Sequence, residues 1–455
     1  MDDSNIPNIR ETVFGYLLRK MVKEATELLC ETFLNRNHVF TIRDDEKCEM
    51  WVYNEGIYIP EGKSYIKQYC RDILDDCYNA FVVNQVVNKI EVDTFINPRD
   101  FFEERNFDEI PVLNGILNVK TRNLRPYDPT TIFFNKINIE YDVDKEISKI
   151  KDFFYSILSV EEVEILQELF GYSLYKKYNY QKAFMFLGSG SNGKSVLIDL
   201  FKRFVSAENT SSLSLHQIQN LDSFGIAELF NKMINMSGDI SNKMLTETAI
   251  FKQIIGGERI GANRKFKNMI YFHNYAKFIN SCNQLPKTTD LTDGFFRRWI
   301  ILNFIQKFVT QSEYDKLTDK ERVNTHIANE QILNEMTTPT EMSGLLMWAL
   351  EGLDRLFKNK SFSNSKTTKE IKQEWLKLSN SFEAFFMDCI VEEYDSYIVK
   401  SELLEAYKKY CQEHNIKSES TKTIHYTLTK EHACWTERRY INDDREWVWV
   451  GIKLK

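Results

Sequence analysis

One eight-residue motif constrains the fold of this chain more than any other feature. Residues 188–195 read G-S-G-S-N-G-K-S, which matches the G-x-x-x-x-G-K-[ST] pattern of a phosphate-binding loop. The apolar run at 183–187 predicts a buried parallel strand before the loop, and residues 195–201 predict a helix after it. Strand, loop and helix in this order are typical of an α/β fold with a parallel sheet, so we expect that fold class.

The composition of the loop indicates which kind of ligand it holds. Its glycines let successive backbone N–H groups point at a triphosphate, and the N-terminus of the next helix adds partial positive charge there. We expect Lys194 to reach the β- and γ-phosphates and the Ser195 hydroxyl to ligate Mg²⁺. A chance match in a Gly/Ser loop is the alternative, but the flanking strand and helix favour a nucleotide site. The predicted nucleotide-binding residues are Gly188, Ser189, Gly190, Ser191, Asn192, Gly193, Lys194 and Ser195.

Composition and charge narrow the remaining possibilities. The chain has 455 residues, 43% hydrophobic and 27% charged, which is the usage of a globular protein of roughly two to four domains. Its net charge of −7 excludes a uniformly basic surface, so nucleic acid would have to bind at local patches. The eight cysteines and seven histidines show no metal-ligand spacing, and no apolar run approaches the ~18 residues of a membrane span. We therefore expect a cytoplasmic protein with reduced thiols and no membrane contact.

Two further apolar segments end on polar residues of the kind that nucleotide hydrolysis requires. Residues 233–239 predict a strand with Asp239 at its end, where a carboxylate can hold Mg²⁺ or polarise water. Residues 276–282 predict another strand, and Asn283 directly after it could orient the attacking water beside the γ-phosphate. Ordinary turns after core strands are the alternative for both residues.

Arginines and a basic cluster are candidate partners for phosphate. Arg297 and Arg298 precede an apolar strand, and one of them could be a finger that neutralises transition-state charge on a neighbouring subunit's nucleotide; a surface ion pair is the alternative. The segment 252–267 is the densest basic cluster of the core, and its Gly256-Gly257 pair favours a hairpin loop that tracks a phosphate backbone. The candidate DNA contacts in this segment are Arg264, Lys265 and Lys267, with a solvated charged face as the alternative.

The C-terminal residues predict a winged helix. Helices are expected at 381–392, from an N-cap at Ser401 and from Ser420, and two alternating strands are expected at 435–440 and 447–452. In a winged helix the third helix would enter the major groove while the β-hairpin touches the backbone. The candidate DNA contacts are Lys422, Lys430, Arg438 and Arg439. Asp443 and Asp444 at the hairpin tip would repel phosphate, which leaves a protein-binding winged helix as the alternative.

The remaining segments predict how the chain divides. Helices are expected at 10–35, 63–90, 146–177 and 326–357, a hairpin at 49–59 turning at 54–56, a β-rich stretch at 110–141, and a linker at 357–372. Four regions follow: an N-terminal α+β domain (1–145), the nucleotide-binding core with its leading helices (146–310), a helical lid and linker (311–372), and the winged helix (373–455).

Four of these elements, in this order, resemble superfamily 3 helicases. They are the G-S-G-S-N-G-K-S loop, the strand ending at Asp239, the G-G-E-R…R-K-F-K segment, and F-I-N-S-C-N-Q-L-P followed by F-F-R-R-W. They are most similar to the branch of poxvirus-type and phage or plasmid primase-helicases, and residues 110–137 resemble the small domain that precedes the helicase in that branch. The resemblance covers about residues 50–310.

The resemblance implies an AAA+ P-loop core that hydrolyses ATP with Mg²⁺. It also implies a homo-oligomeric ring, a hexamer, around single-stranded or forked DNA, so that only the loops lining the channel meet DNA and the acidic exterior does not. The implied roles are phosphate and Mg²⁺ binding for Lys194 and Ser195, the Walker B acid for Asp239, the sensor for Asn283, the trans-acting finger for Arg297 or Arg298, and the pore hairpin for Lys265 and Lys267.

Two departures from the family pattern qualify this reading. Many relatives carry two adjacent acids at the Walker B position, but here Ile240 follows Asp239, which leaves Glu247 as a candidate base. No metal-binding D-x-D arrangement in a strand precedes the loop, so we expect no primase activity and, as a partner, a separate primase or origin-binding protein. The leading prediction is an ATP-dependent replicative DNA helicase of a virus or mobile element. A non-unwinding AAA+ switch for origin recognition or partner recruitment is the alternative, and an RNA helicase is a third reading.

Overall fold

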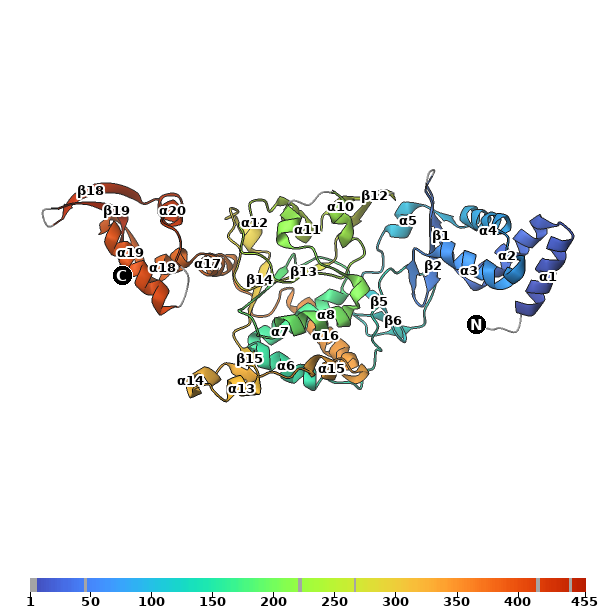
Figure 1. Ribbon diagram of the computed structural model, residues 1–455, viewed down its shortest axis with the longest axis horizontal. Coiled ribbons are helices and arrows are strands. Elements are labelled where there is room, and N and C mark those ends of the chain that lie inside the picture. The colour runs from blue at the N-terminus through green and yellow to red at the C-terminus, as the bar shows by residue number, and fades with distance from the viewer. Residues whose placement is uncertain (1–5, 45–46, 220–222, 266, 415–417, 442–443) are drawn as a thin grey trace.

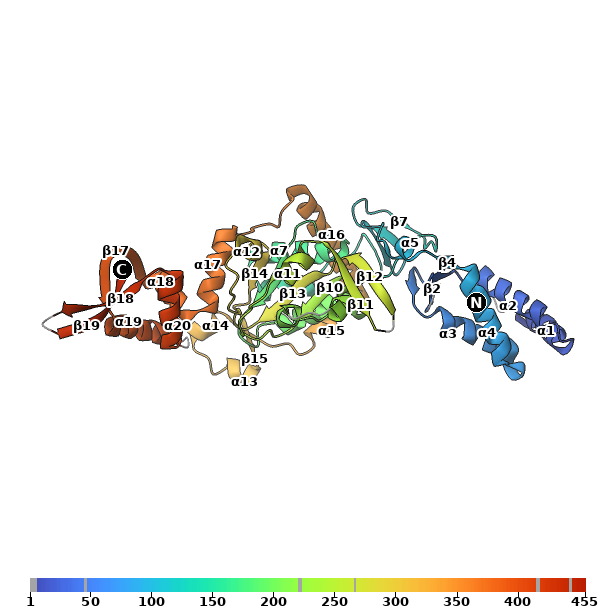
Figure 2. The ribbon, with the colours of Figure 1, turned by 90° about the horizontal axis from the view of Figure 1, so that it is seen from above.

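The computed structural model arranges the chain as three units along one long axis, with the N-terminal elements at one end and the C-terminal elements at the other (Figures 1 and 2). It describes residues 6–44, 47–219, 223–265, 267–414, 418–441 and 444–455. The loop at 188–195 lies in the central unit, which therefore positions the candidate nucleotide site. Among the described helices, none combines the length and apolar character that a membrane crossing needs.

The N-terminal unit packs helices against a small sheet. Its helices are α1 (Ile6–Leu18), α2 (Val22–Arg36), α3 (Gly62–Leu74), α4 (Ala80–Asp93) and α5 (Pro98–Phe102), and the sheet order is β3 (Ile57–Ile59), β2 (Glu49–Asn54), β1 (Val39–Ile42), β4 (Phe95–Ile96). The predicted hairpin is confirmed, with Glu55 and Gly56 both at positive φ in its turn. Each of the two long predicted helices is interrupted, because Lys20 and Asp75 also adopt positive φ and break the helical hydrogen-bond pattern.

The β-rich stretch packs on the central unit. β5 (Glu109–Val112), β6 (Gly115–Asn118) and β7 (Leu124–Arg125) form an antiparallel sheet, and Leu113 and Asn114 make the turn between β5 and β6. Buried side chains between Ile110 and Tyr141 belong to the same hydrophobic cluster as the helices of the central unit. This segment is therefore fixed to the core and not only to the sheet that precedes it.

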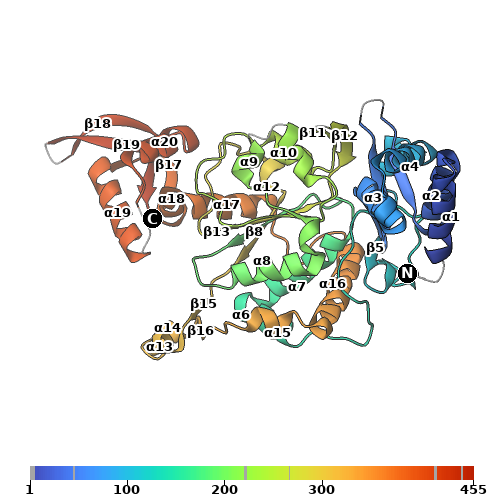
Figure 3. The same cartoon turned by 45° about the vertical axis from the view of Figure 1, so that its right-hand side comes forward.

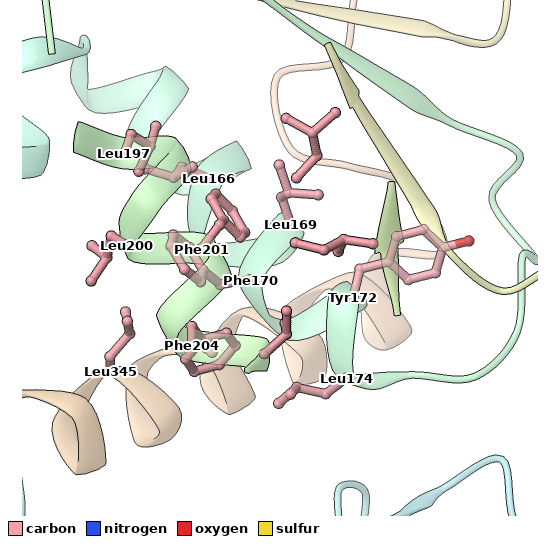
Figure 4. Close-up of a cluster of buried hydrophobic side chains, with 14 of the residues drawn as sticks. Leu166, Leu169, Phe170, Tyr172, Leu174, Leu197, Leu200, Phe201, Phe204 and Leu345 are labelled. Atoms are coloured by element: carbon pink, nitrogen blue, oxygen red, sulfur yellow. The ribbon is translucent and has the colours of Figure 1, made fainter. Parts of the chain in front are cut away.

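The central unit is built on a five-stranded sheet in which all pairs are parallel. Its strand order is β14 (Trp299–Asn303), β8 (Ala183–Leu187), β13 (Lys277–Cys282), β10 (Ile234–Ser237), β9 (Thr210–Ser211). The α/β class with a parallel sheet is thus confirmed. α6 (Lys149–Ile157), α7 (Val160–Leu174), α8 (Lys194–Val205) and α16 (Pro339–Asn359) contribute to one hydrophobic cluster with β8, where Phe170 stacks on Phe201 with ring centroids 3.7 Å apart (Figure 4).

Two carboxylates fix the helices that lead into this core. Ser159 and Glu162 form a reciprocal capping box at the start of α7. The nearly buried Glu341 carboxylate accepts backbone N–H groups of Ser148, Lys149 and Ile150 at 3.1–3.2 Å, which satisfies the N-terminus of α6.

Smaller elements connect the main ones. They are α9 (Leu215–Gln219), α10 (Ser223–Ile226), α11 (Ala249–Ile255), α12 (Asp293–Phe296), β15 (Lys307–Val309), α13 (Gln311–Tyr314), α14 (Asp319–Arg322), β16 (Thr325–Ile327) and α15 (Ile332–Met336). α13 and α14 project from the core beside the paired strands β15 and β16 (Figure 3).

The basic segment of the core forms a hairpin, but its turn differs from the predicted one. β11 (Arg259–Arg264) pairs with β12 (Lys267–His273), with Arg264 opposite Lys267, so the chain reverses between these two residues. The Gly256-Gly257 pair instead follows the end of α11, where Gly257 has φ +71. That part of the prediction was wrong because glycine at positive φ ends helices as readily as it makes hairpin turns.

The predicted linker at 357–372 is held to the core. α16 continues to Asn359, and buried Phe362 packs against Tyr172 and Phe184 with ring centroids 5.7 and 5.2 Å apart. α17 (Thr368–Ser379) buries Trp375 in the cluster around Trp299, at a centroid distance of 5.1 Å. The C-terminal unit with its own hydrophobic cluster begins only at α18 (Ser381–Cys389).

The C-terminal unit combines three helices with a three-stranded antiparallel sheet in the order β17-β19-β18. Its elements are α18 (Ser381–Cys389), β17 (Ile390–Val399), α19 (Lys400–Glu413), α20 (Thr421–Tyr426), a single π-turn (Thr427–Glu431), β18 (Trp435–Ile441) and β19 (Asp444–Leu454). The predicted helices, hairpin strands and Ser420 cap are confirmed. Two details were wrong: residues 390–392 begin a strand, and Ser401 lies inside α19, whose N-cap is Val399.

His432 ties two elements of this unit together. Its ring stacks on Phe386 and lies between the carboxylates of Glu383 in α18, at 3.1 Å, and Glu392 in β17, at 2.8 Å. Burial alone would lower the pKa of His432, but the hydrogen bonds and charges of Glu383 and Glu392 outweigh burial and raise it.

Candidate nucleotide site

The loop at 188–195 owes its shape to two of its three glycines. It joins the fully buried strand β8 to α8, whose N-cap Gly193 has φ +85. A Cβ on Gly193 would lie 2.6 Å from Cγ2 of Ile157, and one on Gly188 would lie 2.4 Å from the Phe304 carbonyl oxygen. A Cβ on Gly190 would meet nothing within 4 Å. The glycines at both ends of the loop are therefore required by close packing, and the middle one is not.

Lys194 is folded back onto this loop. Its ammonium donates to the carbonyl oxygen of Gly188, and lies 3.3 Å from that of Ser189 and 3.2 Å from Oδ1 of Asn192. Burial lowers the pKa of Lys194, while the charges of Cys282 and Asp239 oppose the shift. A cation that contacts carbonyl oxygens would form stronger, charge-assisted hydrogen bonds with an anion, so this arrangement of Lys194 suits phosphate.

The sheet order brings the other candidate residues to the same edge. β13 lies between β8 and β10, so Asn283 after β13 and Asp239 after β10 follow neighbouring carboxyl ends of parallel strands. Asn283 Oδ1 is 3.5 Å from Nζ of Lys194, and the backbone N–H of Ile240 donates to the Ser281 carbonyl oxygen at 2.8 Å. The side chains of Ser195, Asp239 and Asn283 are all exposed at this edge, so a ligand can reach them.

The two arginines differ in accessibility. The side chain of Arg297 is exposed and has no ion-pair partner in the part of the chain that the structure describes. Arg298 is buried, its guanidinium donates to the Gly294 carbonyl oxygen, and burial together with the Arg297 charge lowers its pKa. Of the two arginines, Arg297 is the one exposed on the surface. Glu247 accepts the backbone N–H of Ala249 at 2.7 Å and lies before α11.

The basic β11–β12 hairpin contacts the N-terminal unit through one of its candidate residues. Arg264 Nη1 lies 2.9 Å from Oε1 of Glu49 in β2, and its guanidinium sits 5.6 Å from the ring centroid of Phe102. Arg264 is therefore an interdomain contact, a role that sequence reasoning missed because its partner is remote in the chain. Lys265 is exposed beside the turn. The side chain of Lys267 lies outside the described residues.

The candidate DNA contacts of the C-terminal unit also differ in whether their side chains are exposed or already paired. Lys422 and Lys430 are exposed. Arg439 forms an ion pair with Glu437 on its own strand and lies 4.5 Å from the ring centroid of Tyr397. Arg438 lies 4.9 Å from the ring centroid of Trp447 across the hairpin. Of the predicted aspartates, Asp444 begins β19, and Asp443 lies outside the described residues.

Two contacts that sequence reasoning missed connect the segment after Asn283 to the C-terminal part of the chain. Nε1 of Trp375 donates to the Pro286 carbonyl oxygen at 2.9 Å, and Lys287 pairs with Glu419 at 2.7 Å. Neither contact has a sequence signal, because each joins residues that are distant in the chain. The segment after Asn283 therefore contacts α17 and the residues just before α20.

The donor set at this edge fits Mg²⁺ with a nucleotide. Among the described residues, no three carboxylates, thiols or imidazoles converge as a metal site of their own. Mg²⁺ usually binds through one or two protein oxygens together with substrate phosphates and water, and exposed Ser195 and Asp239 supply such oxygens. The residues present therefore match a metal that arrives with its nucleotide.

Comparison with protein families and curated proteins gives three similarities. Residues 9–159 match the family model "D5 N terminal like", and residues 186–298 match "Family of unknown function (DUF5906)". A protein of Acanthamoeba polyphaga mimivirus named "Putative helicase L207/L206" is 25% identical over 401 residues. The aligned part is 83% of this chain and 39% of the mimiviral protein, so the chain spans about two-fifths of the length of that relative.

Solved structures of similar shape include two apo structures of the NrS-1 C-terminal region. They are 13% and 14% identical to this chain, with TM-scores of 0.47 and 0.45. Each alignment covers 93% of this chain and 98% of the solved chain.

Proposed function

Because the chain belongs to the phage and viral primase-helicase family of superfamily 3 type, we propose that it is an ATP-dependent replicative DNA helicase. A helicase-related role in viral or phage replication follows from its family; hydrolysis, translocation and unwinding are the proposal. The observation that carries it is the convergence of Lys194, Asn283 and Asp239 at one edge of the parallel sheet.

Each residue at this edge has a distinct task in the proposal. The loop N–H groups and Lys194 bind the triphosphate, exchanging the carbonyl contacts of the lysine for phosphate oxygens. Ser195 and Asp239 hold Mg²⁺, which neutralises charge on the β- and γ-phosphates when bound. Asn283 orients the attacking water and, through the 3.5 Å contact to Lys194, senses whether the γ-phosphate is present.

Exposed Arg297 supports a ring in which subunits complete one another's sites. Its side chain has no ion-pair partner among the described residues, as expected of a finger that neutralises charge on a neighbour's nucleotide. In an AAA+ hexamer of this kind, Lys265 on the β11–β12 hairpin would face single-stranded DNA in the channel. The C-terminal order of helix, strand, two helices and two strands supports a winged helix.

ATP hydrolysis with and without single-stranded DNA tests the proposal. Wild-type protein is expected to hydrolyse ATP faster when DNA is present, and Lys194→Ala to be inactive under both conditions. Lys265→Ala should keep basal hydrolysis and lose the stimulation by DNA. Wild-type ATP hydrolysis at the same rate with and without DNA would instead support the non-unwinding switch.

A further inference from the structure

The β18–β19 ribbon projects beyond the helices of the C-terminal unit (Figures 1 and 3). Residues directly opposite each other in an antiparallel pair share one face of the sheet. Arg438 lies opposite Trp447, and Tyr440 lies opposite Arg445, two residues further along the same face. This face, the arginine face, therefore carries two successive cross-strand pairs (rungs), each of which combines one aromatic residue with one arginine.

Charge is divided unequally between the two faces. The rungs of the opposite face pair Glu437 with Val448, Arg439 with Glu446, and Ile441 with Asp444. Every carboxylate of the described rungs therefore lies on that face, where Glu437 also neutralises Arg439. The arginine face has no acidic rung, and Arg438 and Arg445 have no ion-pair partner within the described chain.

The rings of the arginine face are accessible and accompanied by cations. Tyr440 is 76% exposed and Trp447 is 45% exposed. The guanidinium of Arg438 lies 4.9 Å from the ring centroid of Trp447, and that of Arg445 lies 6.0 Å from the ring centroid of Tyr440. Lys400 at the start of α19 adds a third cation 5.1 Å from Trp447. Solvent-exposed large aromatics are costly to leave uncovered, and unpaired arginines beside them favour an anionic, planar ligand.

We infer that the arginine face binds unpaired nucleotides, with bases stacked on Trp447 and Tyr440 and phosphates contacted by Arg438 and Arg445. Stacking on aromatic rings with flanking cations is how single strands are held without sequence preference. Duplex reading by the third helix is less well supported. α20 and the π-turn that continues it (residues 421–431) together carry two lysines, Lys422 and Lys430, and no arginine.

The choice of DNA as the ligand rests on the proposed helicase function. In that function the ribbon would hold a displaced or incoming single strand at the fork, outside the channel. An acidic peptide would use the same arginines but would not need both rings, so it is an outcome that the experiment can separate.

Binding of labelled oligo-dT to the full chain without ATP tests the inference, read by anisotropy and by tryptophan fluorescence. Stacking on one ring is worth about a 5- to 150-fold change in affinity. Trp447→Ala and Tyr440→Ala should each lose about that much, whereas Trp447→Phe should keep the affinity and lose most of the fluorescence quenching. Trp435→Ala is the matched control, because Trp435 is exposed on the opposite face and should be silent.

The outcomes separate this inference from the proposed function. Wild-type affinity in both Trp447→Ala and Tyr440→Ala, or an equal loss in Trp435→Ala, would overturn the inference, as would tighter binding to an acidic peptide than to oligo-dT. Tyr440 is so exposed that its replacement should not disturb folding. ATP hydrolysis is measured on the same preparations. If hydrolysis is normal but the ribbon variants bind oligo-dT like the wild type, only this inference is wrong. If hydrolysis is absent but the ribbon variants lose affinity for oligo-dT as expected, only the helicase proposal is wrong.

Discussion

Replacing Gly193 by alanine tests how the nucleotide loop is built. Two costs follow from the structure. An L-residue at φ +85 pays about 1–2 kcal/mol relative to glycine. A Cβ 2.6 Å from Cγ2 of buried Ile157 also forces the end of α6 to move, at about 1–3 kcal/mol. The sum is about 2–5 kcal/mol, which for a core of this size corresponds to a fall in melting temperature of about 4–20 °C.

Gly190→Ala is the matched control within the same loop. Its Cβ would meet nothing within 4 Å, and its φ does not require glycine. The variant should melt at the wild-type temperature or slightly above it, because alanine reduces the entropy of the unfolded chain. Thermal unfolding followed by circular dichroism, with ATP affinity measured by calorimetry, compares the two variants.

A second variant separates the two costs of the alanine. In an Ile157→Ala background the clash disappears, so adding Gly193→Ala should cost only the backbone part, about 1–2 kcal/mol. Wild-type stability of Gly193→Ala, an equal loss in Gly190→Ala, or an unchanged cost in the Ile157→Ala background would refute this reasoning.

Three further predictions concern residues outside the loop. Arg297→Ala should keep ATP binding and lose about 10³-fold or more in hydrolysis rate, and mixing it with Lys194→Ala subunits should restore part of the activity; a mixture with no activity would argue against a finger acting between subunits. Glu341→Ala should lower core stability by at least about 2 kcal/mol in denaturant titrations, since backbone N–H groups of α6 lose their acceptor; an unchanged midpoint would contradict this. Because the pKa of His432 is raised in the folded state, protonated His432 stabilises the fold. This contribution to the free energy of unfolding is complete below the unfolded-state pKa, near 6.5, and is lost as pH rises through the folded-state pKa. The melting temperature of His432→Gln should therefore approach that of wild type as pH rises, and a gap that widens would be the wrong sign.

Local patterns predicted the parts of the site that depend on local structure. The loop, the strand that precedes it and the polar residues at two strand ends are recognisable because each is set by a few neighbouring residues. Their convergence depends on β13 lying between β8 and β10, a long-range pairing that periodicity does not encode. The sequence therefore predicted that Asp239 and Asn283 follow strands, as they do in the structure, without predicting the order of the strands.

Long-range contacts explain where the predictions were wrong or incomplete. Arg264 stays a predicted DNA contact, but its ion pair with Glu49, which lies far away in the sequence, was not predicted. Residues 390–392 read as the end of a helix, and pairing with β19 makes them a strand instead. The arginine face could not be predicted from the sequence either. The pairing register of the two strands, with Arg438 opposite Trp447, decides which side chains share a face.

ATP-dependent unwinding of a forked DNA duplex tests the central claim most directly, with wild-type protein compared against Lys194→Ala. We predict that the wild type separates the strands only when ATP and Mg²⁺ are present, and that Lys194→Ala does not separate them. Equal unwinding by both proteins, or no strand separation by a wild type that hydrolyses ATP on this substrate, would contradict a helicase driven by this loop.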